Sequence, residues 1–316
     1  MRPPVDDPLP PHPRLRSGLV VVPRDGGEVQ LGVGPDAVLL QGADDDLVQL
    51  VARLDGTRSL RRLREEHPRA AEAVAVLARH GMLEPVAVDS GPVLVVGAGR
   101  LGRAIALRLA DAGVPLLLCD PEPPQPGLYP DPPRASAAAS LRALLEAGRA
   151  SGPWSGRRRP VVGELAHWSE RSHPEPRLAV VALDRVEPDR GLTDHLLRRD
   201  VAHLLVRPLD GGARVGPLVL PGQSCCTRCT DLYRRRHDPG WPRVLAQLVR
   251  RRAVVPELVA DWCASVALPS LLAARQEGTP DLLGRTLDLD VTGWTTRLRR
   301  WPAHPGCGCD LQALQP

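Results

Sequence analysis

The sequence predicts an α/β fold in which a small winged-helix module precedes a parallel sheet with helical crossovers. Three observations lead to this prediction. The apolar residues change from strand spacing to helix spacing near residue 44, a buried strand runs into a glycine-rich turn and a helix after residue 92, and four of the seven cysteines form two close pairs. A chain of 316 residues is long enough for two domains. We expect a disordered arm over residues 1–17, the module over 18–88 and the larger domain over 89–316.

The module is expected to contain three short strands followed by three helices. The strands read GLVVVPR, EVQLGVG and AVLLQG, and turn-forming residues separate them. Asp44, Asp45 or Asp46 can cap the first helix, Ser59 can cap the second, and Pro68 opens the third. Three strands and three helices in so short a segment are typical of a winged-helix module.

The larger domain opens on a glycine-rich turn between a strand and a helix. Gly97, Gly99 and Gly102 form a G-x-G-x-x-G motif. The first glycine permits a tight turn, the second lets a phosphate approach the backbone, and the third lets helix and strand pack closely. Asp120 ends the next strand, where an acid can accept hydrogen bonds from ribose hydroxyls. Asp184 follows a later strand, where an acid can hold Mg²⁺, cap the helix that begins near Pro188 or lie solvated in a loop. The pattern predicts a Rossmann unit and leaves open whether a nucleotide is still bound.

The rest of the larger domain alternates between strands and helices. Seven prolines between Pro121 and Pro133 forbid regular structure there. The segments LAVVALD and AHLLVRP are expected strands, and GPLVLPG leads into the first cysteine pair. A helical stretch from Val244 to Gln276, broken around Pro256, precedes a hairpin of RTLDLDV and TTRLRRW.

Two cysteine pairs near the C-terminus predict a metal site. The candidate ligands are Cys226, Cys229, Cys307 and Cys309. Four thiolates in two short chelating loops suit structural zinc, which prefers closed tetrahedral thiolate coordination. Cys225 can exchange with Cys226, and His304 can replace a thiolate, but the C-x-x-C spacing favours the four named ligands. Cys119 and Cys263 lie in apolar segments and are expected in the core.

Composition limits the classes of function. The net charge is only +4, and no aromatic residues interleave with the arginine clusters at 157–159, 234–236 and 250–252, so we expect solvated clusters and no nucleic-acid binding. The first residues lack the apolar core of a signal peptide, and no apolar run is long enough to span a membrane, so we expect a cytoplasmic protein without membrane contact. All 41 basic residues are arginine and asparagine is absent, which excludes any mechanism that needs a lysine or an asparagine of this chain.

The order of these motifs resembles the ThiF/MoeB/ubiquitin-activating superfamily over residues 90–310. That resemblance implies ATP binding, adenylation of the C-terminal carboxylate of a small protein, and a homodimer. The stretches CTRCTDLYRRRHDPGWP and HPGCGC resemble one branch more closely. This branch contains the ThiF-like proteins of azole-containing ribosomal peptide (bacteriocin) biosynthesis, which partner a YcaO-type cyclodehydratase. The module, with Leu54-Asp55-Gly56-Thr57 between its helices, resembles the PqqD-like leader-peptide recognition element that is fused there.

The chain departs from the superfamily at the residues that carry its chemistry. Adenylating members have an Asn-Leu-x-Arg-Gln run after the acid-terminated strand and a nearby lysine, whereas this region reads PEPPQPGLYPDPPR. Arg134 can replace the charge of the lysine, but a planar guanidinium is not an equivalent phosphate ligand. The departures therefore imply degenerate ATP chemistry and leave it open whether the protein is an enzyme.

The expected function is to bind a precursor peptide and present it to a YcaO-type cyclodehydratase. The leader is expected to add as a strand to the edge at Val38, Leu39 and Leu40. Its apolar side chains are expected to enter a groove beside the third helix, at Val74 and Leu77. The first alternative is an adenylyltransferase that holds ATP and Mg²⁺ with the glycine loop and the two acids. The second is a nicotinamide-dependent oxidoreductase, which the glycine motif permits but the cysteine pairs do not favour.

Overall fold

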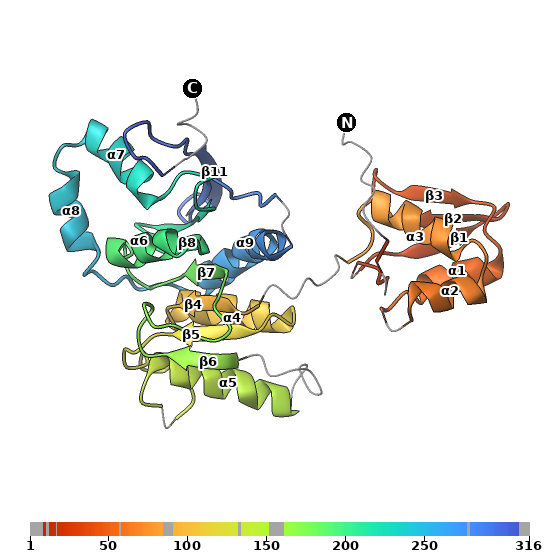
Figure 1. The fold of residues 1–316 in the computed structure, drawn as a ribbon, viewed down its shortest axis with the longest axis horizontal. Coiled ribbons are helices and arrows are strands. Elements are labelled where there is room, and N and C mark those ends of the chain that lie inside the picture. Colours follow the sequence, from red (N-terminus) through yellow and green to blue (C-terminus); the bar gives the residue numbers. More distant parts are fainter. Residues whose placement is uncertain are drawn as a thin grey trace. The chain divides into compact units, whose positions relative to one another are not determined.

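The structure is a computed structural model, and it describes residues 9–10, 13–16, 18–56, 58–84, 91–131, 134–151, 161–276 and 279–309. The chain divides into two compact units, Met1–Val88 and Asp89–Pro316. Figure 1 draws the first unit in red to orange and the second in yellow to blue. Each unit has an apolar core of its own.

The smaller unit combines a three-stranded antiparallel sheet with three helices. Its elements are β1 (Val21–Arg24), β2 (Glu28–Leu31), β3 (Val38–Gln41), α1 (Asp45–Ala52), α2 (Leu60–Glu66) and α3 (Ala70–Arg79). The strand order β1-β2-β3 places β3 at an edge of the sheet. The side chain of Asp44 caps α1 by accepting from the Leu47 N–H, and Ser59 caps α2 by accepting from the Arg62 N–H. The strands and helices predicted for this segment are confirmed.

Residues 13–16 belong to the smaller unit, so the expected disordered arm is wrong for them. The Leu15 N–H donates to the Leu54 carbonyl at 2.9 Å, and the Glu84 N–H donates to the Arg14 carbonyl at 2.7 Å. The segment therefore lies between the chain after α1 and the chain after α3. Proline-rich composition suggests disorder, but it does not prevent an extended segment from pairing through its remaining backbone groups. The rest of the expected arm, apart from residues 9–10, lies outside the described residues.

The larger unit is built on an eight-stranded sheet in the order β11-β10-β9-β8-β7-β4-β5-β6. The strands are β4 (Val93–Val96), β5 (Leu116–Cys119), β6 (Val161–Leu165), β7 (Leu178–Val181), β8 (Ala202–Leu209), β9 (Gly212–Val219), β10 (Arg285–Asp290) and β11 (Thr295–Arg300). Strands β8, β7, β4, β5 and β6 are parallel, and β9, β10 and β11 continue the sheet antiparallel. Every residue of β4, β5 and β7 is buried, as expected for parallel strands covered on both faces.

Helices cover both faces of this sheet (Figure 1). They are α4 (Arg100–Asp111), α5 (Ala137–Ser151), α6 (Arg190–Arg198), α7 (Thr227–His237), α8 (Trp241–Leu248) and α9 (Glu257–Arg275). Alternate strand residues point to opposite faces, so Val93 and Val95 pack with α4, α5 and α9, whereas Leu94 and Val96 pack with α6. Helix α9 has the length and composition of a membrane span, and its residues Val259, Cys263 and Leu271 are buried in the core that it shares with α4.

The strand order brings the glycine loop and Asp184 to one place. The chain runs from β4 to β5 and β6 on one side and from β7 to β8 on the other, so its direction across the sheet reverses between β4 and β7. Ligands of open α/β sheets bind outside the carboxyl ends of the strands at such a switch point. The glycine loop follows β4 and Asp184 follows β7, so both lie at this point.

The region around the first cysteine pair contains more structure than the sequence indicated. Strand β9 occupies most of the expected lead-in, and α7 begins at Thr227, directly after Cys226. The polar sequence of α7 lacks the apolar stripe that predicts an amphipathic helix, which explains why this helix was not expected. The predicted break at Pro256 and the predicted hairpin are confirmed as the start of α9 and as β10 with β11.

Candidate functional site

The four predicted cysteine ligands meet in one cluster. The Sγ atoms of Cys226, Cys229, Cys307 and Cys309 all lie within 4.8 Å of one another. Cys226 is the N-cap of α7 and Cys229 lies in its first turn, so the C-x-x-C spacing places both thiols at one helix end. The second pair approaches from the chain after β11. The partial positive charge of a helix N-terminus favours thiolates at this position.

The sulfur separations suit tetrahedral coordination. The Sγ atoms of Cys226 and Cys307 are 3.5 Å apart, those of Cys229 and Cys309 3.2 Å, and those of Cys226 and Cys229 4.0 Å. A tetrahedral zinc site with Zn–S bonds of about 2.3 Å needs sulfurs about 3.8 Å apart. Disulfide bonds need about 2 Å, so the separations exclude them here. The cluster can therefore bind a metal ion.

The charges of the cluster also favour a cation. Hydrogen bonding from the Cys226 thiol lowers the pKa of Cys229 to about 4, and the backbone N–H of His304 contributes to the lowering. The same hydrogen bond to Cys229 raises the pKa of Cys226, and burial raises the pKa of Cys307 to about 12. One thiol thus ionises easily while its neighbours keep their protons, because burial and the hydrogen bond to Cys229 disfavour their thiolate forms. A divalent metal ion would stabilise the thiolates.

The other candidate ligands lie outside this cluster. Cys225 is as buried as Cys226, but its thiol does not join the tetrad. The His304 ring accepts from the Gly306 N–H at 3.0 Å and packs edge-on against Tyr233, so it is not positioned as a ligand. Cys119 and Cys263 are buried, as expected, and burial raises the pKa of each to about 12.

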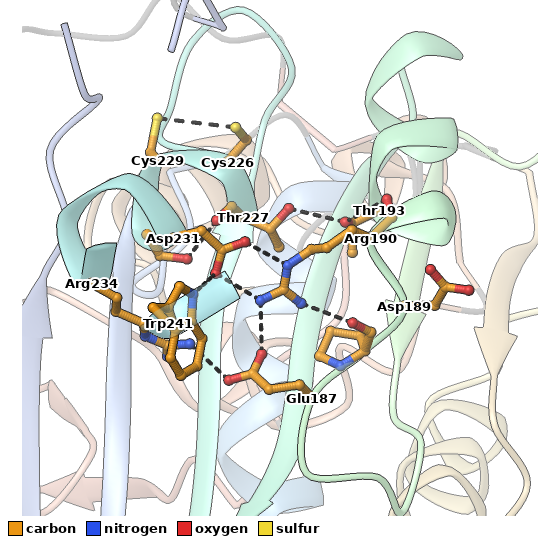
Figure 2. A network of polar contacts seen from close by, with 12 residues as sticks. Glu187, Asp189, Arg190, Thr193, Cys226, Thr227, Cys229, Asp231, Arg234 and Trp241 are labelled. Atoms are coloured by element: carbon orange, nitrogen blue, oxygen red, sulfur yellow. Dashed lines mark hydrogen bonds and ion pairs between the residues drawn. The ribbon is translucent and has the colours of Figure 1, made fainter. Parts of the chain in front are cut away.

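A buried ion-pair network lies beside the cluster (Figure 2). The carboxylate of Glu187 is 3% exposed and accepts from Arg190 at 3.0 Å, from Arg234 at 2.8 Å and also from Arg207. Asp231 binds Arg190 through two contacts of 2.7 and 2.8 Å and accepts from the Trp241 indole N–H at 3.0 Å. Burial alone would raise the pKa of Glu187, but the three guanidinium groups outweigh it and lower that pKa.

The network fixes the helix that carries the first cysteine pair. Arg190 belongs to α6, Asp231 and Arg234 belong to α7, and Arg234 stacks 4.5 Å from the centroid of the Trp241 ring on α8. These contacts tie α7 to the loop after β7, so they position the Cys226–Cys229 turn. The expectation of a solvated arginine cluster is therefore wrong for Arg234. The cluster at 157–159 lies outside the described residues.

The predicted nucleotide residues converge, and the two carboxylates bind backbone N–H groups in and beside the glycine loop. The Asp184 carboxylate accepts from the Arg100 N–H at 2.8 Å, from the Leu101 N–H at 3.1 Å and from the Gln125 amide at 2.8 Å. Asp184 therefore caps α4. The expected cap of α6 is instead Asp189, whose side chain accepts from the Gly191 N–H.

Asp120 is also turned toward the glycine loop. Its carboxylate accepts from the Ala98 N–H at 2.7 Å and from the Glu122 N–H at 3.2 Å. Burial raises the pKa of Asp120, although the Ala98 N–H and Arg252 oppose that shift. The Tyr129 hydroxyl donates to the Ala98 carbonyl at 2.5 Å. The proline-rich segment after β5, which has no helix or strand in its described part, thus lies against the loop.

The predicted peptide-binding residues divide into two groups. Val38, Leu39 and Leu40 lie on the edge strand β3, where Leu39 is 45% exposed. Val74 and Leu77 are completely buried in the core of the smaller unit, so they hold α3 against the sheet and offer no surface to a peptide. The prediction of a groove at these two residues is wrong, because apolar residues at helical spacing are equally typical of a core face.

Solved structures share this fold. MccB of E. coli in complex with MccA aligns with a TM-score of 0.58 and 13% identity, over 94% of this chain and 98% of that chain. The chain has the MccB fold. MccB with ATP aligns with the same score, and the heterocyclase TruD aligns with a TM-score of 0.50 and 19% identity, over 95% of this chain and 43% of TruD. No protein-family model and no curated protein matches the sequence.

The alignment with MccB includes both units, because residues 89–316 alone cannot supply 94% of the chain. It supports the α/β fold that the glycine loop and the alternating strands and helices predict. At 13% identity the similarity concerns the fold alone. The resemblance of the smaller unit to the PqqD-like element stays a prediction.

Proposed function

We propose that the protein binds the leader of a ribosomally made precursor peptide and presents that peptide to a YcaO-type cyclodehydratase. Two structural relatives support a role in peptide maturation. MccB is a microcin C7 biosynthetic enzyme whose structure contains N-formylated MccA, its precursor peptide. TruD is a heterocyclase, and more than half of its chain has no counterpart in this protein. We infer that a partner enzyme supplies the heterocyclase chemistry for which TruD is named.

The observation that carries the proposal is the open edge of β3. Strand β1 lies at the other edge of the same sheet, but Pro23 in β1 has no N–H to offer a further strand. Strand β3 reads VLLQ and contains no proline and no charged residue. Edge strands without such protection are templates for strand addition. The peptide is therefore expected at β3.

The neighbouring residues limit where the peptide can lie. The guanidinium of Arg69 donates to the carbonyl groups of Gln41 and Gly42 and is held by Glu72. The end of β3 is thus occupied, and residues 38–40 remain for pairing. Helix α3 begins next to Arg69, and its partly exposed side carries small residues, namely Ala71, Ala75 and Ala78. Small residues leave room for the side chains of a bound strand.

The experiment titrates the full chain with a fluorescent precursor peptide encoded beside its gene. Leu39→Pro should weaken binding at least about tenfold, because proline removes a backbone donor and disrupts the edge. Leu39→Ala keeps the backbone donor and should retain most of the affinity. Unchanged binding in a folded Leu39→Pro variant, or no binding by the wild type at millimolar peptide, contradicts the proposal.

We propose zinc as the metal of the cysteine cluster, in a structural role. All four candidate ligands are cysteines. Four protein ligands fill a tetrahedral zinc site, so no coordination position is left for a reacting water. We also propose a cytoplasmic location and a homodimer. Metal analysis and sedimentation of the purified chain test the metal and the dimer.

An active adenylyltransferase is the second candidate, because MccB has been solved with ATP. It would use the glycine loop, Asp120 and Asp184 to hold MgATP. The lack of lysine and asparagine opposes this candidate, since removing a single transition-state contact of this kind costs about 3 kcal/mol. Peptide-dependent exchange of pyrophosphate into ATP would establish it. A nicotinamide-dependent change in absorbance would establish the oxidoreductase alternative.

A further inference from the structure

Three backbone N–H groups of the glycine loop and the start of its helix donate to side chains of the same chain. A loop of this kind binds phosphate through the free N–H groups at the start of its helix. In this protein the N–H groups of Arg100 and Leu101 donate to Asp184, and the Ala98 N–H donates to Asp120. The Gly97 N–H donates to the Cys119 carbonyl at 2.9 Å. A phosphate would have to displace two carboxylates to reach these donors.

The glycines of the motif are explained without a nucleotide. Gly97 has a φ of +107°, a conformation that L side chains rarely adopt. A Cβ at Gly99 would collide with the Asp184 carboxylate, and a Cβ at Gly102 would collide with the Gly97 carbonyl. In a nucleotide-binding loop the second glycine lets a phosphate approach the backbone, whereas at Gly99 the Asp184 carboxylate makes that approach. The glycine motif therefore makes room for contacts within the chain, including the Asp184 carboxylate.

The nearby cations are also paired. Arg100 and Arg103, in the first turn of α4, both bind Glu257 at the start of α9, at 2.8 and 2.5 Å. Arg185 and Arg252 both bind Glu122 in the proline-rich segment. A nucleotide would thus meet two carboxylates and arginines that already have partners.

We propose that Asp184 is a built-in occupant of the phosphate position, and that it closes the glycine loop in place of a nucleotide. The residues present therefore do not fit the ATP that the superfamily resemblance implies. The Asp184 carboxylate has the charge and the acceptor geometry of a phosphate oxygen pair. Being tethered to the loop after β7, it competes with any free anion without the entropy loss of association. This inference concerns the larger unit and is independent of leader binding at β3.

The test compares the full-length wild type with Asp184→Ala. Removing the carboxylate frees two helix N–H groups and lowers the local negative charge. Inorganic phosphate and MgATP should therefore bind the variant at least about tenfold more tightly than the wild type in calorimetry. Phosphate should also raise the urea midpoint of the variant but not that of the wild type, because a ligand stabilises the state that binds it.

Asp189→Ala is the matched control. Asp189 also caps a helix, α6, and its carboxylate accepts from the Gly191 N–H at 2.8 Å. This control should lose stability without gaining affinity for phosphate. If Asp184→Ala does not fold, Asp184→Asn keeps the volume and removes the charge, and it should show the same gain to a smaller extent. Tight ATP binding by the wild type, or no gain in a folded Asp184 variant, overturns the inference.

Discussion

Replacing Cys229 with serine is expected to remove the metal and to destabilise the larger unit. The magnitude follows from the length of chain that the metal closes. Cys226 and Cys307 are 81 positions apart, and their Sγ atoms lie 3.5 Å from each other. A cross-link that closes a loop of this length lowers the entropy of the unfolded chain by an amount worth about 4.5 kcal/mol. We therefore expect a loss of about 4 kcal/mol in the free energy of unfolding.

The assay combines metal analysis with urea unfolding, before and after treatment with a chelator. Wild-type protein should contain one zinc per chain and should be destabilised by the chelator, whereas Cys229→Ser should contain none and should not respond. Cys225→Ser is the matched control, because Cys225 and Cys226 are equally buried and only Cys226 belongs to the tetrad. It should keep its zinc and lose only about 1–2 kcal/mol, the cost of a buried hydroxyl.

Three results would refute this reasoning. The first is a metal-free wild type that is as stable as the protein with metal. The second is a Cys229→Ser variant with unchanged stability. The third is a Cys225→Ser variant that loses its zinc while Cys226→Ser retains it, which would show that the adjacent thiol is the ligand.

Three further predictions concern charge, chemistry and peptide binding. Glu187→Gln should lower the free energy of unfolding by about 3 kcal/mol, because it leaves the guanidiniums of Arg190, Arg207 and Arg234 without their shared carboxylate. The pKa of Glu187 is lower in the folded state than its ordinary value of 4.5. Its carboxylate therefore stabilises the fold above pH 4.5, and this stabilisation is lost as the pH falls through the folded-state pKa. The urea midpoints of the wild type and Glu187→Gln should accordingly converge in acid. Pyrophosphate exchange into ATP should be absent or very weak with any candidate peptide, and robust exchange that is lost in Asp184→Ala would reverse this conclusion. Leu39→Pro should weaken leader binding and leave the zinc content intact, and a parallel loss of zinc would indicate general misfolding.

The cysteine cluster was predictable because the sequence signal that indicates it is local. Each cysteine pair is a short chelating segment, so the spacing alone indicates which residues act together. Only the meeting of the two pairs depends on long-range structure, and a metal site with four cysteine ligands requires the pairs to meet. Most elements of both units were predictable for a similar reason, since caps, prolines and apolar periods act within one turn or one strand, whereas the polar helix α7 offered no such signal. The place of residues 13–16 in the smaller unit was not predictable, because their backbone partners lie on distant segments of the chain.

The occupant of the glycine loop could not be read from the sequence. Asp184 and Arg100 are 84 positions apart, and the sequence shows only that both follow buried strands. An acid at that position is compatible with a metal ligand, a helix cap or a solvated residue. The distinction depends on whether the carboxylate points at the N–H groups of α4, which is a matter of tertiary structure. The strand order alone would have placed the two segments together without deciding their contacts.

The buried ion pairs were not predictable for a different reason. Glu187, Arg190, Asp231 and Arg234 look like ordinary surface residues in a chain that is 25% charged. The spacing of Glu187 to Arg190 permits an ion pair, but such pairs are mostly exposed. Burial becomes favourable only because three cations and two carboxylates from separate elements meet in one place. The sequence contains no local signal for that convergence.

The groups that could bind a ligand are paired to different extents in different parts of the chain. In the larger unit, the carboxylates at the switch point bind the glycine loop, and the nearby arginines of α4 bind Glu257. The cysteine cluster, in contrast, brings four thiols within 4.8 Å of one another, so it can bind an external metal ion. Two sheet edges can be compared in the same way. Strand β11 carries Arg297, Arg299 and Arg300, charges that discourage pairing with a further strand, whereas β3 carries none. The glycine loop thus has acceptors within its own chain, whereas the apolar edge strand β3 has no such protection in the described residues, and this contrast supports the proposed binding of a peptide at β3.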